Sequence, residues 1–144
     1  MPKVQAATVR WAGHVVPEAV DGQTLVHTDV TPHNFMIHAS GVAVVDWSMP
    51  CRGPAWIDTA LMMVRLIRAG HSPAQAEAWA SQISVWSAAR PEAVDAFAAG
   101  VAALSRDRQQ QRPSATHVGP LADAADSWSN YRNDEKPSAA TPRA

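Results

Sequence analysis

Three polar side chains in the first third of the chain suggest its chemistry. The segment His27-Thr28-Asp29-Val30-Thr31-Pro32-His33-Asn34 places an aspartate five residues before an asparagine, and Val44-Val45-Asp46-Trp47 follows it. Phosphoryl transfer asks a protein for a carboxylate near the acceptor hydroxyl and for oxygen ligands to Mg²⁺. We therefore predict Asp29 as the catalytic base, and Asn34 and Asp46 as metal ligands.

Short β-strands are expected to position these side chains. Residues 24–27, 35–38 and 42–45 are β-rich, and Ala39-Ser40-Gly41 separates the last two, which indicates a hairpin. Asp29 and Asn34 then lie in the loop before the hairpin, and Asp46 directly follows its second strand. The first 20 residues are ambiguous, although Gly13 suits the end of a short helix.

The pattern beyond Ala55 is helical. Apolar residues recur at helical spacing until Gly70, which ends the first helix. Ser72-Pro73-Ala74-Gln75 is typical of a capping box and predicts a second helix to about Ala89. Pro91 opens a third helix, the polar segment 109–119 follows it, and residues 121–131 form a short fourth helix.

These elements predict an α+β fold that is mainly α-helical. A small β-hairpin carries the catalytic and metal loops, and helices follow it. We assign residues 1–20 to an N-terminal remnant or partial helix, 21–131 to the folded domain, and 132–144 to a disordered tail. The 144 residues suffice for one hydrophobic core.

Composition excludes several classes of partner. The formal charge is −1 and no basic run occurs, which argues against nucleic acid. No stretch is long and apolar enough to span a bilayer, and the N-terminus lacks an apolar signal region, so we expect a cytoplasmic protein without a membrane partner. The single cysteine, Cys51, cannot form an internal disulfide, and we expect an inert thiol.

The combined motifs resemble the aminoglycoside phosphotransferase and choline kinase-like family, and specifically its C-terminal lobe, in a fold related to that of protein kinases. Members typically carry His-Gly-Asp-x-x-x-x-Asn followed by Ile-Asp-Trp or Val-Asp-Trp, which correspond to residues 27–34 and 45–47 here. Thr28 and His33 stand where glycine is common. The resemblance covers about residues 20–131 and is specific over 24–60.

A further part of the resemblance concerns support of the catalytic loop. The family has an aspartate at a helix start, matched here by Pro54-Ala55-Trp56-Ile57-Asp58-Thr59-Ala60. The resemblance implies that Asp58 holds the catalytic loop through backbone hydrogen bonds and that His27 packs within that loop. Both residues would then have structural roles.

The resemblance also implies ATP and Mg²⁺ as cofactors. The γ-phosphoryl group would pass to a hydroxyl of a small, aminoglycoside-like molecule. The family's first lobe supplies a glycine-rich phosphate loop and a strand lysine. This sequence has no Gly-x-Gly-x-x-Gly, and its lysines, Lys3 and Lys136, lie in no such strand. We therefore expect a truncated product, an isolated domain or a diverged lobe.

Two consequences are expected of such a chain. By itself it binds ATP weakly and transfers phosphate poorly or not at all. It also self-associates through apolar surface that a first lobe would cover, including residues near Val42 to Val45.

Other interpretations remain open. The chain is alternatively a non-catalytic remnant or interaction module of the same fold. A metal-dependent hydrolase is a third hypothesis, based on His27, His33 and His38, whose spacing matches no common zinc signature.

Several further side chains have two interpretations each. Arg52 either faces phosphate or is solvated, and Asp123 and Asp126 either meet a cationic acceptor or lie on a solvated helix face. Four tryptophans on the predicted helices are either core or substrate contacts: Trp56, Trp79, Trp86 and Trp128.

Overall fold

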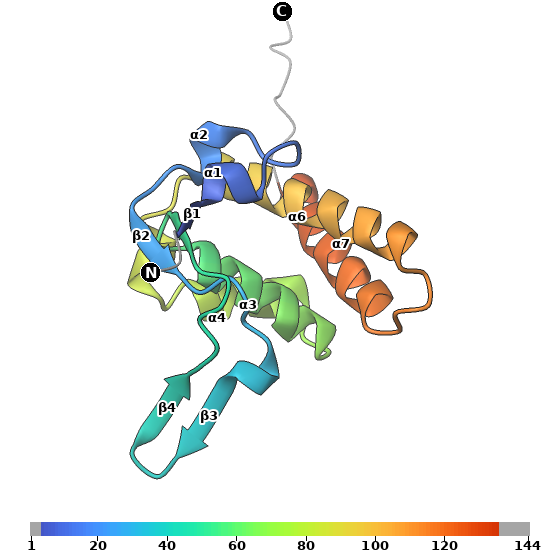
Figure 1. Cartoon of the computed structure of the whole chain (residues 1–144). Helices are drawn as coiled ribbons and strands as arrows, with labels where there is room; N and C mark the ends of the chain where they lie inside the picture. Colours follow the sequence, from blue (N-terminus) through green and yellow to red (C-terminus); the bar gives the residue numbers. More distant parts are fainter. Residues whose placement is uncertain (1–3, 136–144) are drawn as a thin grey trace, which may run out of the picture.

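The computed structural model describes residues 4–135, in which two small sheets are followed by packed helices (Figure 1). The fold is mixed α+β and mainly helical, as the sequence predicts. No helix within residues 4–135 has the length and apolar content needed to cross a bilayer.

The first sheet has three short strands in the order β1 (Gln5–Ala6), β5 (Cys51–Gly53) and β2 (Thr24–Val26). Strand β5 is parallel to β1 and antiparallel to β2. Strand β5 forms where the sequence predicts a loop. Its partners lie more than 20 residues away in the chain, so no local sequence pattern predicts the pairing.

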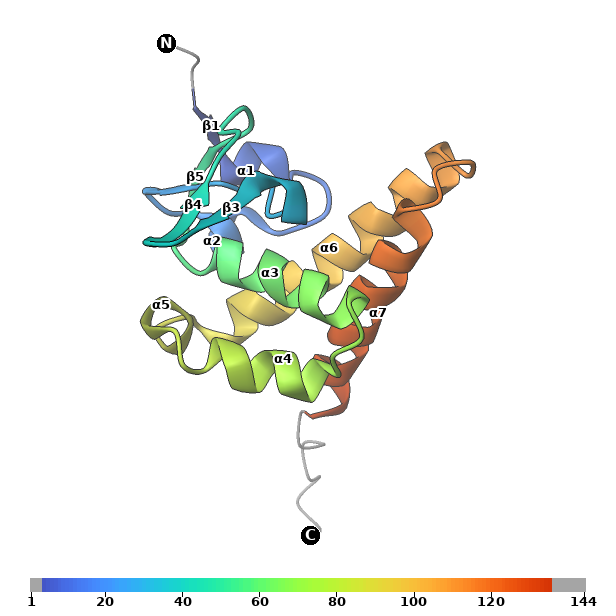
Figure 2. The same cartoon turned by 90° about the horizontal axis from the view of Figure 1, so that it is seen from below.

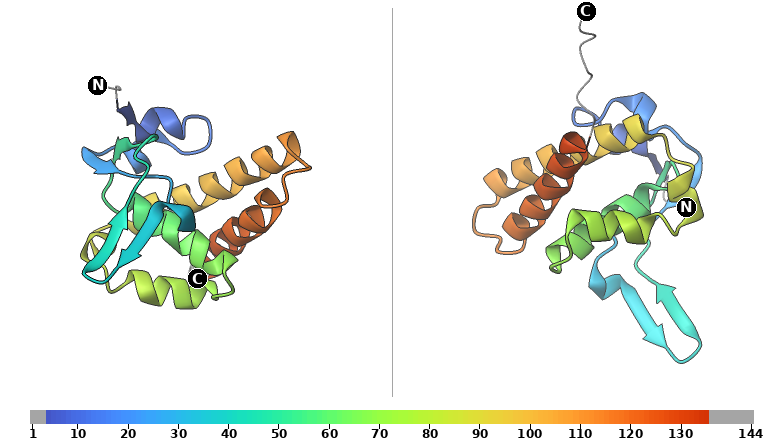
Figure 3. Two further views of the ribbon diagram at one scale, coloured as in Figure 1. Left: turned by 60° about the horizontal axis from the view of Figure 1, so that its bottom comes forward. Right: turned by 180° about the vertical axis from the view of Figure 1, so that it is seen from behind.

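The second sheet is the predicted hairpin. Strand β3 (Phe35–His38) pairs antiparallel with β4 (Gly41–Val44), and Phe35 lies opposite Val44. A short 3₁₀ helix, η1 (Pro32–Asn34), leads into β3. The hairpin projects from the body of the molecule in Figures 1 and 3.

Seven α-helices complete the described structure. Two short ones, α1 (Ala7–Arg10) and α2 (Pro17–Val20), precede β2, and Gly13 between them has a φ of 83°. Helix α7 packs on α6 and α3, and α4 packs on α3 and α7 (Figure 2). The later helices are α3 (Ile57–Arg68), α4 (Pro73–Ala80), α5 (Ser84–Ser87), α6 (Pro91–Gln111) and α7 (Val118–Asp134).

The helix predicted from Pro73 to about Ala89 is wrong beyond Ala80. Its capping box is present, because the Ser72 hydroxyl accepts from the Gln75 N–H and the Gln75 side chain accepts from the Ser72 N–H. The helix then stops. The Ser81 hydroxyl donates to the Ala78 carbonyl, and Ile83 is extended at φ −101° and ψ 120°. Serine side chains compete for backbone groups in this way, which favours a break.

Helices α6 and α7 are longer than predicted. Helix α6 continues to Gln111, because the first residue whose backbone disfavours the helical conformation is Arg112, which precedes Pro113. Helix α7 begins at Val118, since Pro120 falls in its first turn, where proline is tolerated. At its end, residues 132–134 are helical rather than part of the predicted tail. Glu135 follows as the C-cap of α7, and the other residues of that predicted tail, 136–144, lie outside the described residues.

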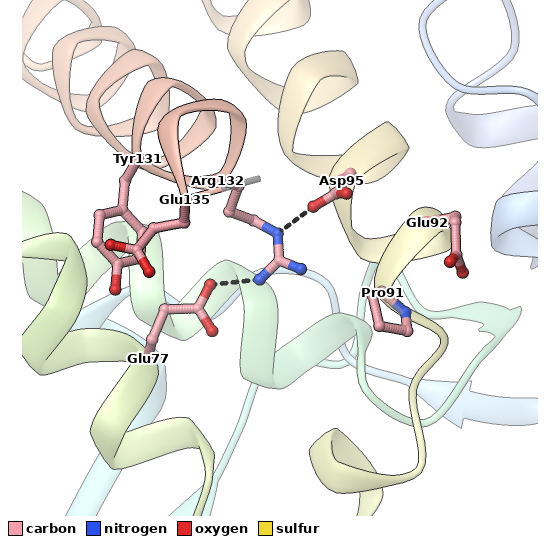
Figure 4. A pocket seen from close by; sticks show the side chains of 7 residues that line it. All are labelled: Glu77, Pro91, Glu92, Asp95, Tyr131, Arg132 and Glu135. Carbon is pink, nitrogen blue, oxygen red and sulfur yellow. Dashed lines mark hydrogen bonds and ion pairs between the residues drawn. The ribbon is translucent and has the colours of Figure 1, made fainter. Parts of the chain in front are cut away.

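The end of α7 is held by ion pairs, which explains why the helix passes residue 131. Figure 4 shows Arg132 between Glu77 of α4 and Asp95 of α6. The buried Trp128 indole also donates to Glu77, at 3.0 Å. Burial lowers the pKa of Arg132, but the hydrogen bonds to Asp95 and Glu77 outweigh it and raise that pKa. These contacts join three helices at one end of the molecule.

The core is built around aromatic rings. The buried Phe97 of α6 meets Trp11 edge to face at 5.2 Å and Trp56 at 5.3 Å. Trp86 lies between Trp56 and Trp128, at 6.5 and 6.4 Å. Trp86 lies in α5, after the break that follows α4. Three of the four tryptophans considered above, Trp56, Trp86 and Trp128, therefore contribute to packing.

Gly100 in α6 permits the closest approach in this core. A Cβ at this position would lie 2.6 Å from the carbonyl oxygen of His14 and 2.3 Å from a methyl group of Val15. We predict that Gly100→Ala destabilises the protein by about 1–3 kcal/mol through overpacking. Helix propensity alone would favour alanine by about 1 kcal/mol. Urea unfolding of both proteins measures the difference.

Gly119→Ala is the matched control. Its added Cβ would meet only the end of the flexible Gln109 side chain, at 3.0 Å. We expect stability to be unchanged or slightly increased there. Equal effects of the two substitutions would contradict the close packing of α6 on residues 14–15.

Candidate active site

The loop that follows β2 is held by a carboxylate from α3. Asp58, in the first turn of that helix, accepts from the backbone N–H of His27 at 2.7 Å and of Thr28 at 2.8 Å. Both amides lie just beyond the last β2 residue, Val26. A carboxylate that receives two N–H groups makes strong, charge-assisted hydrogen bonds. Asp58 therefore positions the start of the loop.

His27 connects the two halves of the site. Its side chain is 2% exposed. Nε2 lies 2.8 Å from the Val45 carbonyl oxygen, and Nδ1 lies 3.2 Å from the Asp29 backbone nitrogen. A carbonyl only accepts and an amide N–H only donates, so His27 is neutral with its proton on Nε2. The indole of Trp47 packs against its ring at 4.6 Å.

Asn34 fixes the conformation of Asp29. Its amide nitrogen donates to the Asp29 backbone oxygen at 2.8 Å and to the Asp29 carboxylate at 3.1 Å. Both partners are acceptors, which sets the orientation of the amide. The amide oxygen is consequently the atom of this buried side chain that remains to face a cation.

A further backbone bond closes a ring of hydrogen bonds, which we call the loop ring. The Val45 N–H donates to the Asn34 carbonyl at 2.9 Å. The ring therefore runs from Asp29 to His27, to Val45, to Asn34 and back to Asp29. It brings together the predicted base, one predicted ligand and the residue before Asp46. The side chain of Asp46 is exposed.

Two loop residues have left-handed backbone conformations. Thr28 has a φ of 67° and Asp46 a φ of 59°. The conformation of Thr28 gives a physical reason for a glycine at this position. Here the Thr28 hydroxyl donates to the Met49 carbonyl at 2.8 Å, a bond that glycine could not make.

A cavity of about 210 Å³ opens beside Asp29. Helices α3, α6 and α7 line it opposite the loop, through Leu61, Leu104 and Leu121 among others. Three arginines also line it: Arg10, Arg65 and Arg108. Sequence reasoning missed them. Arg108 could have been selected from the sequence, because it follows Val101 and Leu104 at helical spacing and so lies on the same face of α6.

The charges of these arginines act on one another. Burial lowers the pKa of the Arg65 guanidinium and Arg68 lowers it further, while the carboxylate of Asp29 opposes the change. Partial desolvation likewise lowers the pKa of Arg108, with Arg10 and Arg112 contributing. The cavity therefore concentrates positive charge.

Two other cavities have different surroundings. The cavity of Figure 4, about 430 Å³, is lined by the ion pairs of Arg132 with Glu77 and Asp95, so its central charges already have partners. A largely apolar cavity of about 240 Å³ lies beneath the hairpin, where Trp47 and Trp79 line it.

The remaining side chains with sequence hypotheses have clear surroundings. Burial raises the pKa of the Cys51 thiol above its usual range, although Arg10 opposes this. Arg52 is exposed and contacts Gln23 at 3.5 Å. Asp123 and Asp126 both form ion pairs with Arg106.

The histidine-rich loop does not gather its side chains around a metal. His38 bonds to Ser40 at 2.9 Å, and both ring nitrogens of His27 meet backbone groups. Within residues 4–135, no three His, Cys, Asp or Glu side chains converge as a metal-binding group. A site formed by Asn34 and Asp46 would contain only one residue of these four types, so this observation does not bear on it.

Asp58→Asn tests how the loop is held. Asparagine has one acceptor oxygen, and its NH₂ would face the second backbone N–H. We predict a loss of about 1–3 kcal/mol in the free energy of unfolding, because one amide is left unsatisfied. Hydrogen exchange at the His27 and Thr28 amides should become faster.

Asp46→Asn is the matched control for this change. Asp46 is exposed, and asparagine tolerates its left-handed conformation, so stability should stay within about 0.5 kcal/mol. Unchanged exchange at His27 and Thr28 in the Asp58 variant would show that this carboxylate does not hold the loop.

Comparison with known proteins identifies the family. Searches of curated proteins and of solved structures gave no match. Residues 2–94, more than half of the chain and the whole of the loop ring, match the family model described as the phosphotransferase enzyme family. The chain therefore belongs to the phosphotransferase enzyme family.

Proposed function

We propose that this chain is the acceptor-binding and metal-binding lobe of an ATP-dependent phosphotransferase, the C-terminal lobe of a protein-kinase-like fold. The loop ring carries the proposal, because it joins Asp29 to Asn34 directly and to the metal loop through Val45. A set of loops held in one geometry is what phosphoryl transfer requires, since positioning supplies most of its catalysis.

The proposed reaction transfers the γ-phosphoryl group of ATP to a hydroxyl of a small molecule. A bond forms between the acceptor oxygen and the γ-phosphorus, the bond from that phosphorus to the β–γ bridging oxygen breaks, and ADP leaves. Asp29 accepts the hydroxyl proton. Hydrogen bonds from Asn34 and to His27 hold Asp29 in place for this role.

The donor set fits magnesium. Asn34 would offer its amide oxygen and Asp46 its exposed carboxylate, and hard oxygen ligands are those that Mg²⁺ prefers. Family members generally use ATP and Mg²⁺. When bound, the metal would neutralise charge on the β- and γ-phosphates. Only two protein ligands are needed, because phosphate and water complete the coordination of Mg²⁺ in such sites.

The first lobe of the family supplies groups that the described residues lack. Residues 4–135 contain no lysine, and both lysines of the sequence, Lys3 and Lys136, lie outside the described part. We therefore propose that the chain alone binds Mg-ATP weakly and is slow or inactive as an enzyme. A nucleotide-binding partner or segment would complete the site.

Metal binding can be tested without that partner. Mn²⁺ in the presence of ATP should broaden the amide NMR signals of Asn34 and Asp46, and Asp46→Asn should weaken the broadening. Asp29→Asn should retain the broadening. The same Asp29 variant should lower transfer from radiolabelled ATP to hydroxylated acceptors by about 10²–10⁴-fold, the usual contribution of a general base.

Asp21→Asn is the control. Asp21 is exposed at the end of α2, and its substitution removes the same negative charge. It should change neither readout. If the parent transfers phosphate measurably, alone or with a nucleotide-binding partner, and Asp29→Asn transfers it equally, the catalytic proposal fails and the non-catalytic module of the same fold is favoured. Broadening that is insensitive to Asp46→Asn would exclude this carboxylate as a ligand.

The projecting hairpin is the surface proposed to meet the nucleotide-binding part. Paired residues Ile37 and Val42 are 84% and 60% exposed. Exposed apolar patches mark interaction sites. We predict that the chain self-associates through this surface, and that Ile37→Lys with Val42→Lys makes it monomeric by light scattering.

The control for this prediction is Val16→Lys, since Val16 is similarly exposed at 58% but precedes α2. Its self-association should match that of the parent. A parent chain that is monomeric at all concentrations would contradict the prediction.

A further inference from the structure

The cavity beside Asp29 has an unusual balance of charge. Its lining includes three arginines, one on α1, one on α3 and one on α6, against a single acidic residue, Asp29. The wall between them is mostly apolar, with Leu61, Leu104 and Leu121 among the other lining residues.

Two of these arginines have no fixed partner in the described structure. Arg10 donates to the Met49 carbonyl at 3.4 Å. Within residues 4–135, neither the Arg65 nor the Arg108 side chain forms a hydrogen bond or an ion pair. By contrast, Arg106 and Arg132 each pair with two carboxylates. The cavity thus contains guanidinium groups whose donors are available.

These groups are also held where positive charge is unfavourable. Burial lowers the pKa of Arg65, and desolvation lowers that of Arg108. Each also lies near a further arginine, Arg68 for the first and Arg112 for the second. An anion in the cavity would relieve this repulsion, and guanidinium groups bind carboxylate and phosphate oxygens in a two-pronged geometry.

We propose that the acceptor is a small hydroxylated molecule with an anionic carboxylate or phosphate group, which Arg65 and Arg108 bind while Asp29 receives the hydroxyl. The inference rests on the proposed function, because it names the substrate class of the same site. The cavity, about 210 Å³, is smaller than the roughly 300–1,000 Å³ of pockets for drug-sized ligands, which suits a small acceptor.

The same charges disfavour a polycationic acceptor of the aminoglycoside type. A site discriminates by like-charge repulsion as well as by attraction. Asp123 and Asp126, the acidic pair that a cationic acceptor would need, are both engaged by Arg106. In the described lining of the cavity, Asp29 is the only carboxylate, and it is the proposed base.

Binding of matched polyols to the whole chain tests the proposal. Glycerol 3-phosphate and glycerate carry the two anionic groups, glycerol is their neutral counterpart, and choline is a cationic alcohol. NMR titration should give dissociation constants for glycerol 3-phosphate or glycerate at least tenfold lower than for glycerol. Arg65→Gln and Arg108→Gln should each weaken anion binding about tenfold, as expected for a lost charge-assisted hydrogen bond.

Arg52→Gln is the control, because it removes one positive charge from an exposed position that does not line the cavity. It should leave anion binding within twofold of the parent, which separates local binding from the effect of net charge. Thermal unfolding of all three variants shows whether each one folds. The glycerol 3-phosphate and glycerate arms distinguish a phosphate-bearing acceptor from a carboxylate-bearing one.

Three results would overturn the proposal. Choline or glycerol could bind as tightly as both anions, or folded Arg65→Gln and Arg108→Gln variants could bind the anions like the parent. Finally, Mg-ATP could displace glycerol 3-phosphate and lose affinity in the same arginine variants, which would make the cavity a nucleotide site. None of these results depends on phosphate transfer, so failure here is distinct from failure of the Asp29→Asn test.

Discussion

The carboxylate of Asp58 is the contact on which the geometry of the site depends. Strand β2 ends at Val26, so the next two backbone amides need acceptors outside the sheet. Asp58 supplies both from the first turn of α3, where the helix dipole favours a negative charge. This contact places the start of the loop on a rigid helix. The rest of the site then follows from how the loop closes on itself, because each later residue is held through His27 or Asn34.

The loop ring uses nearly every polar atom of the two side chains that form it. His27 donates through one nitrogen and accepts through the other, and the Asn34 amide donates twice to Asp29. Such a network offsets the strain of two left-handed residues, Thr28 and Asp46, which costs of order 1–3 kcal/mol each. That strain has a consequence for function. At φ 59° the chain turns directly after Val45, and the carboxylate of Asp46 stays exposed next to the ring.

The parts of this molecule that local sequence determines could be predicted, and those that depend on distant partners could not. The hairpin and the capping box of α4 follow from residues adjacent in the chain. Strand β5 depends on pairing with distant strands. The site divides in the same way. Five motif residues within 32 positions of one another could be selected by type and spacing. Arg65 and Arg108 lie on different helices, and only the packing of α3 and α6 brings them to one cavity.

Charge connects the loop ring with the arginines of the neighbouring cavity. The loop ring holds the carboxylate of Asp29, the proposed base, at one side of a cavity, and arginines from α3 and α6 line the same space. Arg65 and Asp29 attract each other, yet they form no ion pair within residues 4–135. Both groups therefore remain available to a bound molecule. A hydroxyl and an anionic group on one small acceptor would satisfy both at once, so that binding at the arginines also orients the reacting hydroxyl. Binding energy at the anion would then contribute to positioning, which phosphoryl transfer requires most from the protein.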